Sequence, residues 1–444
     1  MDDEELVLYD EPRKSYDLLN KRIKLLNNLF KSIYRNPFSL FNRKRLLRLK
    51  SILIERLSCY SSYEHPDKPC IFFDMSKVCL YDKGTGIQRV VKSIFFALKA
   101  IEEQRNFVVV PVFATFFSKG YSLLQCETIG NNLKFTNLRK YIEPRVGDVF
   151  LSFENEFNSQ ASLRKVFLSY KKNGCRIILG VHDILPITIP TCWPPGYTES
   201  FQNWLMSSLD YADFICVSKY TQQQLDEWIK KHTNKQVMTT HFCLGSNFSK
   251  ICLDLKNFES SLKKLIPEGL TFLMVGTLEP RKKHLFVIKA FEHLWKLKIA
   301  VNLIIVGKKG WMIDELTKYI ANHSQKNRRL FYFDKVSDTD LTYFYMTSDA
   351  LIAASLDEGF GLPLIEAASF NLPIIARDIP VFREVAKNSA FYFQSDSSEG
   401  FSREVLHWIN LKKSDSIPKS NNLEYLTWSQ SCEELLKKLK LSNL

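Results

Sequence analysis

The chain alternates between short apolar runs and longer, more polar stretches. A short apolar run followed by a helix-length polar stretch is typical of a buried parallel strand and its crossover helix. The runs lie at residues 71–74, 107–112, 148–152, 176–181 and 214–217, and again at 270–275, 302–306, 330–333, 351–355 and 373–376. The pattern therefore predicts an α/β protein with two doubly wound parallel sheets, one in each half of the chain.

Breaks in this pattern predict the domain boundaries. Residues 65–69 read as a linker, and the polar stretch 247–268 is expected to contain the connection between the two sheets. The last residues have the apolar spacing of a helix. We therefore expect four parts: a helical extension (1–66), a first Rossmann-like domain (67–250), a second one (251–424) and a carboxyl-terminal helix (425–444).

The amino-terminal extension carries most of the excess positive charge. The chain of 444 residues has a formal net charge of +13, and residues 13–56 hold thirteen Lys or Arg against two acidic residues. Apolar residues in this segment recur at helical spacing, which predicts basic amphipathic helices. Such helices either bind an anionic membrane surface or pack on the first domain with a solvated basic face, and the sequence favours neither. Nucleic acid is not an expected partner, because the aromatic side chains lie on the apolar side of these helices.

Composition indicates a globular protein. Hydrophobic residues make up 45% and aromatic residues 13% of the chain, which is enough for the cores of two or three domains. The first residues are acidic, whereas a secretory signal would begin with basic residues, so no such signal is predicted. No apolar run reaches about 18 residues, so no membrane span is predicted. We therefore expect a cytoplasmic protein. If the basic extension binds an anionic membrane surface, we expect the protein to be peripheral at the inner face of the cell membrane.

The segment after residues 351–355 has the features of a ligand site. Gly359 and Gly361 let a ligand approach the backbone, and Pro363 suits the first turn of a helix, which we expect to begin near Leu362. The unpaired N–H groups at such a helix start form a natural seat for a phosphate.

Two glutamates flank this helix start. Glu358 lies on the loop and Glu366 about one turn inside the helix, where each carboxylate can accept hydrogen bonds from hydroxyl groups. An arbitrary pair of this kind is more often a surface residue and a helix cap. This pair, however, follows a predicted buried strand, and open α/β sheets bind ligands at the carboxyl ends of their strands. The segment therefore predicts a sugar-nucleotide site.

The run "SLDEGFGLPLIEAASFNLPII" resembles the retaining glycosyltransferases of family 4, and bacterial polysaccharide and O-antigen mannosyltransferases in particular. Further matches follow in order at "DKGTGIQRVV" (82–91), "VHDILPITIP" (181–190), "CVSKYT" (216–221), "VGTLEPRKKH" (275–284) and "IIVGKKGW" (304–311). The resemblance covers roughly residues 67 to 435. It implies the GT-B fold, in which two Rossmann-like domains face each other across a cleft.

The resemblance also assigns roles near the expected phosphates. It implies that Arg281 and Lys282 hold the donor diphosphate, although Thr277 stands where many members have a further arginine. Gly86 is expected to bring backbone amides close to the donor. Arg89 either contacts substrate or is structural.

By the same resemblance, His182 contacts the donor sugar and stabilises positive charge at its anomeric carbon through its ring or its backbone carbonyl. Glu358 would hold sugar hydroxyls and Glu366 the ribose. The predicted catalytic residues are His182, Glu358, Arg281 and Lys282. The predicted donor-binding residues are Gly86, Gly276, Arg281, Lys282, Gly307, Val336, Glu358, Gly359, Phe360, Gly361, Leu362 and Glu366.

The implied reaction transfers a hexosyl group from a nucleotide diphosphosugar to an acceptor hydroxyl with retention of anomeric configuration. Mannose from GDP-mannose is the first choice, and glucosyl, rhamnosyl and N-acetylhexosaminyl donors stay open. The expected acceptor is a lipid-linked saccharide or a growing surface polysaccharide, and no cofactor is expected. The alternatives are a non-catalytic module of GT-B type that binds a membrane or a partner, and another sugar-nucleotide enzyme of this fold, such as an epimerase.

No metal site is predicted. Asp338 and Asp340 have the Asp-x-Asp spacing of metal-dependent glycosyltransferases of another fold. They follow Ser337 and precede apolar residues at helical spacing, and acidic residues are favoured in a capped first turn. We therefore expect them to belong to a helix start.

Overall fold

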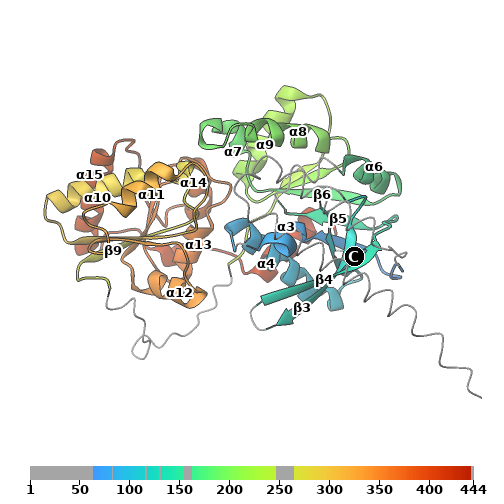
Figure 1. The fold of residues 1–444 in the computed structure, drawn as a ribbon, viewed down its shortest axis with the longest axis horizontal. Coiled ribbons are helices and arrows are strands. Elements are labelled where there is room, and N and C mark those ends of the chain that lie inside the picture. Colours follow the sequence, from blue (N-terminus) through green and yellow to red (C-terminus); the bar gives the residue numbers. More distant parts are fainter. Residues whose placement is uncertain are drawn as a thin grey trace, which may run out of the picture.

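The computed structural model describes residues 64–82, 84–115, 118–129, 132–154, 163–246 and 265–441. In these ranges the chain forms two α/β lobes, each a sheet with helices packed around it (Figure 1). The predicted extension 1–66 lies outside the described residues except for its last three positions. Most of the predicted connection 247–268 also lies outside them.

The amino-terminal lobe is built on a sheet of eight described strands in the order β4-β3-β2-β1-β5-β6-β7-β8. The strands from β2 to β8 along this order run parallel. The strands are β1 (Cys70–Asp74), β2 (Val108–Phe113), β3 (Ser122–Ile129), β4 (Asn132–Tyr141), β5 (Val149–Ser152), β6 (Arg176–Val181), β7 (Asp213–Cys216) and β8 (Thr239–His241). The helices are α3 (Ser76–Tyr81), α4 (Gly86–Ile101), α6 (Arg164–Lys172), α7 (Leu185–Thr188), α8 (Tyr197–Ser208) and α9 (Lys219–His232), with 3₁₀ turns at Glu102–Gln104 and Pro190–Cys192.

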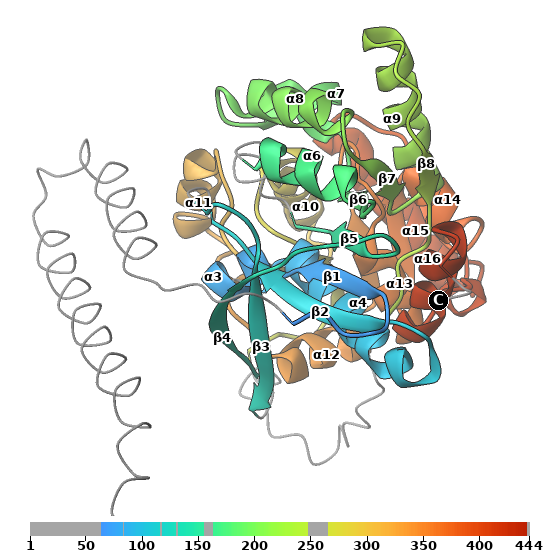
Figure 2. The same cartoon turned by 90° about the vertical axis from the view of Figure 1, so that its right-hand side faces the viewer.

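One edge of this sheet differs from the prediction of a purely parallel sheet. β3 pairs antiparallel with β2 and with β4, so the lobe carries an antiparallel hairpin at its edge (Figure 2). An edge strand needs a partner on one side only, and antiparallel strands can be joined by a short turn without a crossover helix. The first sheet is therefore mixed.

The carboxyl-terminal lobe follows the predicted pattern. Its sheet has six described strands in the order β11-β10-β9-β12-β13-β14, and all neighbours are parallel. The strands are β9 (Leu270–Val275), β10 (Val301–Val306), β11 (Leu330–Phe333), β12 (Ala350–Ala353), β13 (Ile374–Arg377) and β14 (Phe391–Phe393). The helices are α10 (His284–Lys296), α11 (Asp314–Ala321), α12 (Asp338–Thr347), α13 (Leu362–Ser369), α14 (Pro380–Ala386) and α15 (Ser398–Lys413), with 3₁₀ turns at Pro280–Lys282 and Ser420–Asn422.

The last helix, α16 (Trp428–Lys438), returns to the amino-terminal lobe and packs on α4. Its Cys432 Sγ lies 3.7 Å from the Ile94 carbonyl oxygen, and Ser431 Oγ donates a hydrogen bond of 2.6 Å to the Cys243 carbonyl oxygen. Figure 1 accordingly shows the carboxyl terminus at the amino-terminal lobe.

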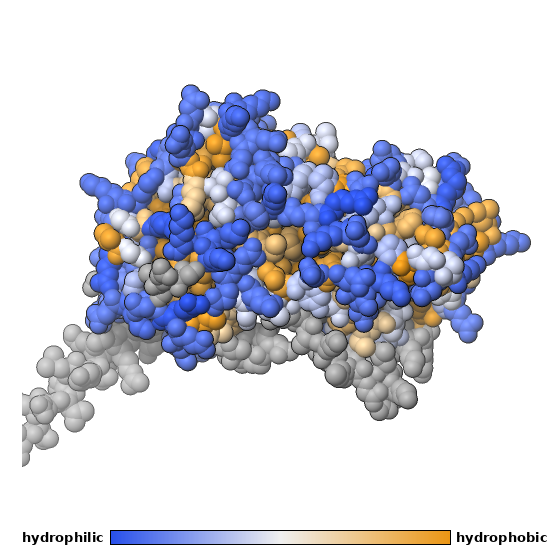
Figure 3. Space-filling model, turned by 180° about the vertical axis from the view of Figure 1, so that it is seen from behind, coloured by the Kyte–Doolittle hydropathy of each residue, from blue (hydrophilic) through white to orange (hydrophobic). Residues whose placement is uncertain are grey.

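The surface is mainly polar on the face shown in Figure 3, where apolar side chains form small groups between hydrophilic ones. Among the described helices, none has the length and apolar character to cross a bilayer.

Candidate active site

The loop between β12 and α13 has the geometry that its sequence predicts. α13 begins at Leu362, with Pro363 in its first turn, so the predicted helix start is confirmed. Gly361, the residue before it, has φ = 100°, a left-handed conformation that glycine adopts without strain. A Cβ atom there would also lie 2.9 Å from the Phe382 ring. Glycine is therefore needed at this turn for two independent reasons.

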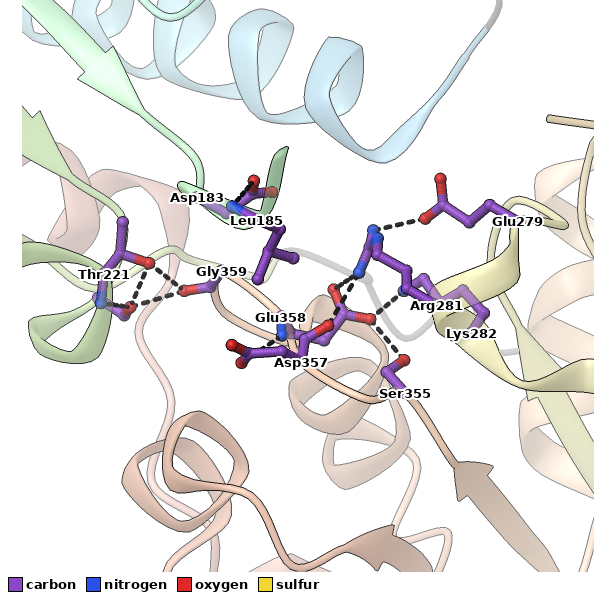
Figure 4. Close-up of polar contacts among 11 residues, drawn as sticks. Asp183, Leu185, Thr221, Glu279, Arg281, Lys282, Ser355, Asp357, Glu358 and Gly359 are labelled. Atoms are coloured by element: carbon purple, nitrogen blue, oxygen red, sulfur yellow. Dashed lines mark hydrogen bonds and ion pairs between the residues drawn. The ribbon is translucent and has the colours of Figure 1, made fainter. Parts of the chain in front are cut away.

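Glu358 lies on this loop and contacts both predicted cations. Its Oε2 is 2.7 Å from Arg281 Nη1, and its Oε1 pairs with Lys282 Nζ and accepts a 2.7 Å hydrogen bond from Ser355 Oγ (Figure 4). Arg281 forms a second ion pair with Glu279, at 2.5 Å. The structure thus brings Glu358, Arg281 and Lys282 together in one cluster at the carboxyl ends of β9 and β12.

Charge compensation governs the chemistry of this cluster. Burial alone would raise the pKa of Glu358, but the charges of Arg281 and Lys282 outweigh it and lower this pKa to about 2. Burial also raises the pKa of Glu279, with Arg281 acting against it. Glu358 is therefore ionised at neutral pH, and it pairs with both cations that were expected to hold a diphosphate.

The space beside Glu358 is small. A cavity of about 20 Å³ is lined by Lys282, His284, Ser355, Glu358 and Gly361, together with apolar residues of β9, β12 and α14. That volume holds about one water molecule. His284 is buried, and its Nδ1 has no hydrogen-bond partner among the described residues. A sugar nucleotide does not fit this cavity in the arrangement observed.

Glu366 is 2% exposed and reaches across the cleft. Its Oε1 is 2.6 Å from Nη2 of Arg89 on α4, and its Oε2 accepts a 2.6 Å hydrogen bond from the Tyr345 hydroxyl. Arg89, which the sequence left as either a substrate contact or a structural residue, links the two lobes here. The two glutamates therefore lie in different surroundings.

His182 faces the glycine loop from the end of β6. A Cβ on Gly359 would lie 1.7 Å from the His182 carbonyl oxygen, so the two backbones touch. The Gly359 carbonyl oxygen accepts hydrogen bonds from Ser218 Oγ (2.6 Å) and Thr221 Oγ1 (3.1 Å). His182 Nε2 lies 2.8 Å from the Phe153 carbonyl oxygen. Burial lowers the pKa of His182, which favours a neutral ring that donates its Nε2 proton to Phe153.

The remaining predicted residues lie on several elements of both lobes. Gly86 opens α4, and a Cβ there would meet open space. Gly276 directly follows β9 and Gly307 directly follows β10, and a Cβ on Gly307 would lie 1.8 Å from the Gly276 carbonyl oxygen. Val336 is half-buried just before α12, whereas Phe360 is buried in the core.

Sequence reasoning missed several residues that position this cluster, namely Ser218, Thr221, Glu279, Tyr345 and Ser355. Glu279 and Ser355 lie within the motifs quoted above, close to the predicted site residues Arg281 and Glu358. Nothing in the sequence marked Tyr345, because it contacts Glu366 only through tertiary packing.

The Asp-x-Asp segment is a helix cap, as predicted. Ser337 accepts a hydrogen bond from the Asp340 amide, and the Asp340 carboxylate accepts in return from Ser337, which forms a capping box. Among the described residues, the group with metal-ligand spacing is His65, Cys70 and Asp148. It lies at the amino ends of β1 and β5, whereas the cleft lies at the carboxyl ends of the strands.

Comparison with known proteins shows the class to which the chain belongs. Residues 257–424 match the family model described as glycosyl transferases group 1. The solved structure of Anabaena Alr3699/HepE with UDP and glucose has a TM-score of 0.54 at 13% identity over 84% of this chain and 97% of its own. Sucrose-phosphate synthase from Thermosynechococcus elongatus has a TM-score of 0.56 at 13% identity over 84% of this chain and 96% of its own. The protein has the GT-B fold, as predicted, and contains a group 1 glycosyltransferase domain.

Two relatives narrow the class further. The serotype-specific mannosyltransferase WbdA of Escherichia coli is 34% identical over 385 residues, which are 84% of this chain and 45% of WbdA. The O-antigen chain mannosyltransferase RfbU of Salmonella typhimurium is 26% identical over 348 residues, which are 76% of this chain and 91% of RfbU. The chain is a homologue of these mannosyltransferases and spans about half the length of WbdA. The predicted resemblance is confirmed, while its assignment to family 4 stays a prediction.

Proposed function

We propose that this protein is a retaining, metal-independent mannosyltransferase that transfers mannose from GDP-mannose to a saccharide acceptor. The observation that carries the proposal is the cluster of Glu358, Arg281 and Lys282, which lies at a helix start and faces His182 of the other lobe. The choice of mannose rests on the names of the homologues WbdA and RfbU.

In the proposed mechanism the departing diphosphate is stabilised more than the bound donor. Arg281, Lys282 and the first N–H groups of α13 face the place where negative charge develops. The diphosphate would replace Glu358 as the partner of the two cations. Glu358 would then be free to accept hydrogen bonds from sugar hydroxyls.

The acceptor would attack the same face of the sugar that the phosphate leaves, and a phosphate oxygen would take the acceptor proton. The neutral His182 ring donates to Phe153, so its backbone carbonyl is the group available to the positively charged anomeric carbon. Glu366 would hold the ribose after the lobes separate and Arg89 releases it. No step of this mechanism needs a metal ion.

The test is nucleotide release from GDP-mannose and from UDP- and dTDP-sugars, with and without a lipid-linked oligosaccharide, followed by NMR of the new glycosidic bond. We expect acceptor-dependent release from GDP-mannose, an α-linked product and full activity in a chelator. If no nucleotide is released from any of these donors, the non-catalytic alternative is favoured. A β-linked product would refute retention.

Two variants separate the roles. Lys282→Ala should mainly lower kcat, because its charge is needed as the diphosphate departs, while Glu366→Ala should mainly raise the KM for the donor. Lys296→Ala, at the exposed end of α10, is the matched control and should behave as wild type. Full activity in both site variants would contradict the assignment.

The acceptor is proposed to be a lipid-linked saccharide or a growing surface polysaccharide, which would place the enzyme at the inner face of the cell membrane. Liposome flotation with anionic lipid, with and without residues 1–66, tests the contribution of the extension. If both forms stay at the bottom of the gradient with lipid-free protein, the extension does not bind the membrane.

A further inference from the structure

A stack of three aromatic rings bridges the two lobes. Trp193 lies between β6 and α8, Tyr197 is the first residue of α8, and Trp311 follows β10 in the other lobe. The Trp193 ring lies 4.8 Å from Tyr197 at 11°, and 4.8 Å from Trp311 at 24°. Trp311 Nε1 donates a 2.8 Å hydrogen bond to the Cys192 carbonyl oxygen.

The backbone holds Trp193 rigidly. Pro190 opens a 3₁₀ turn that ends at Cys192, and Trp193 follows with an extended backbone (φ = −122°, ψ = 152°), the conformation favoured before a proline such as Pro194. Gly196, with φ = 79°, then turns the chain into α8. The backbone at Trp193 is therefore held by its neighbours, and its indole is held by the rings of Tyr197 and Trp311.

The backbone also fixes Trp311. The preceding Gly310 donates a 3.0 Å hydrogen bond to the Leu278 carbonyl oxygen, and a Cβ on Gly310 would lie 2.5 Å from that oxygen. Leu278 directly precedes Glu279 of the charged cluster. Trp311 is thus attached to the loop that carries Arg281 and Lys282.

The stack lies beside these cations. Burial raises the pKa of the Cys192 thiol, and the nearby charges of Lys283 and Arg281 act in the opposite direction. Cys192 is the residue that accepts the Trp311 hydrogen bond. Through the hydrogen bond of Gly310 to Leu278, the aromatic rings are joined to the loop that carries the predicted diphosphate ligands.

Trp193 and Trp311 have the chemistry that recognises a sugar ring. An indole offers an apolar face and one N–H donor, which match the C–H face and the hydroxyl oxygens of a pyranose. Trp193 Nε1 is buried and has no hydrogen-bond partner among the described residues. A buried donor of this kind is costly unless it is satisfied. If the stack of Trp193 on Trp311 served only to join the lobes, the Trp193 N–H group would have no hydrogen-bond acceptor.

We propose that Trp193 and Trp311 form a subsite for a sugar ring of the acceptor saccharide. The two indoles belong to opposite lobes, so separation of the lobes exposes two apolar faces beside the cation cluster. A pyranose ring then stacks on the face of each indole that the other indole now covers. This inference rests on the proposed glycosyltransferase function.

The test compares Trp311→Ala, Trp311→Phe and Trp193→Phe with the control Trp228→Phe. Trp228 stacks on His232 of α9, at 4.6 Å, and belongs to neither side of this stack. Binding of a manno-oligosaccharide is measured by calorimetry without donor, and initial rates are measured with each substrate varied in turn. Circular dichroism checks that each variant is folded.

We expect Trp311→Ala to weaken oligosaccharide binding and to raise the acceptor KM about tenfold, the equivalent of one good aromatic contact, with the donor KM unchanged. Trp311→Phe should keep most of the affinity. Trp193→Phe, which keeps an aromatic ring but removes the N–H group, should weaken binding about threefold. Trp228→Phe should match wild type.

Unchanged acceptor affinity in Trp311→Ala and Trp193→Phe would overturn the subsite. Equal losses for donor and acceptor would also overturn it, because the stack would then only join the lobes. If wild-type protein transfers no sugar from any donor, the proposed function fails, and the calorimetry still decides whether the indoles bind a saccharide.

Discussion

Replacement of Glu358 by Gln removes one negative charge from the cluster and little else. The side chain keeps its volume and can still accept the hydrogen bond from Ser355. The pKa of the wild-type carboxyl is lowered from 4.5 to about 2, because the charges of Arg281 and Lys282 outweigh the effect of burial. A shift of this size corresponds to about 3 kcal/mol of interaction between the ionised carboxylate and its surroundings.

The sign of the pH dependence follows from the lowered pKa. The carboxylate stabilises the folded state fully above the unfolded pKa of 4.5, and this contribution is lost as the pH falls toward 2. At pH 7 we therefore expect Glu358→Gln to lower the free energy of unfolding by about 3 kcal/mol. At pH 3 the difference should fall to about half of that, because the carboxyl is then protonated in the unfolded chain and still mostly ionised in the folded protein.

Urea unfolding at the two pH values measures this difference. Glu292→Gln is the matched control, since Glu292 is a half-buried glutamate of α10 that bonds Tyr319 and His323 outside the cleft. Its effect should stay below about 1 kcal/mol, as for one ordinary hydrogen bond. A loss in Glu358→Gln that is no larger than in this control would refute the electrostatic reasoning.

The same substitution should act in the opposite direction on nucleotide binding. Without the carboxylate, Arg281 and Lys282 are free to pair with a diphosphate, so we expect GDP to bind about tenfold more tightly, which corresponds to about 1.4 kcal/mol. Calorimetry with GDP and with guanosine measures the change, and guanosine, which lacks phosphates, should show none. Weaker or unchanged GDP binding would show that Glu358 does not mask the two cations.

Three further changes test the contacts around the cleft. Gly359→Ala places a methyl group against the His182 carbonyl oxygen, 1.7 Å from it, so we expect small-angle scattering to report a larger radius of gyration; an unchanged radius would contradict the close approach. Arg89→Ala leaves Glu366 buried without its cation, and urea unfolding should show a loss of about 2 kcal/mol; a loss under about 0.5 kcal/mol would argue against the pair. Burial, reinforced by a neighbouring carboxylate, raises the pKa of Glu154 to about 8. The folded state therefore holds a proton that the unfolded state releases, and stability should fall as the pH rises from about 5 to about 8. Glu154→Gln should remove this fall, and an unchanged pH profile would contradict the raised pKa.

Much of the fold follows from local sequence. The parallel strands of both sheets were predicted because a strand buried on both faces must be apolar throughout, and such runs stand out from the more polar stretches between them. The start of α13 at Leu362 was predicted because Gly361 and Pro363 restrict the backbone at that point. In both cases the information lies within a few consecutive residues.

The hairpin of β3 and β4 escaped prediction for a different reason. Its strands lie at an edge and carry many polar residues, so they form no continuous apolar run. A signal was present nonetheless, since Gly130 and Asn131 stand between two stretches that the structure shows as strands, and such a pair is typical of a tight hairpin turn. The ion pairs of Glu358 and Glu366 could not be predicted at all, because each partner comes from a distant part of the chain.

These long-range contacts determine how the cleft must work. The cations are paired with Glu358, the Glu366 carboxylate is paired with Arg89, and the cavity beside them holds about one water molecule. In the proposed function, separation of the lobes would admit the sugar nucleotide and would break the hydrogen bonds from Ser218 and Thr221 to Gly359. The same movement parts Trp193 from Trp311, because these residues lie on opposite lobes. In the proposed function, one opening would expose both the diphosphate seat and the aromatic faces, and closure around both substrates would exclude water from the sugar as the leaving phosphate departs.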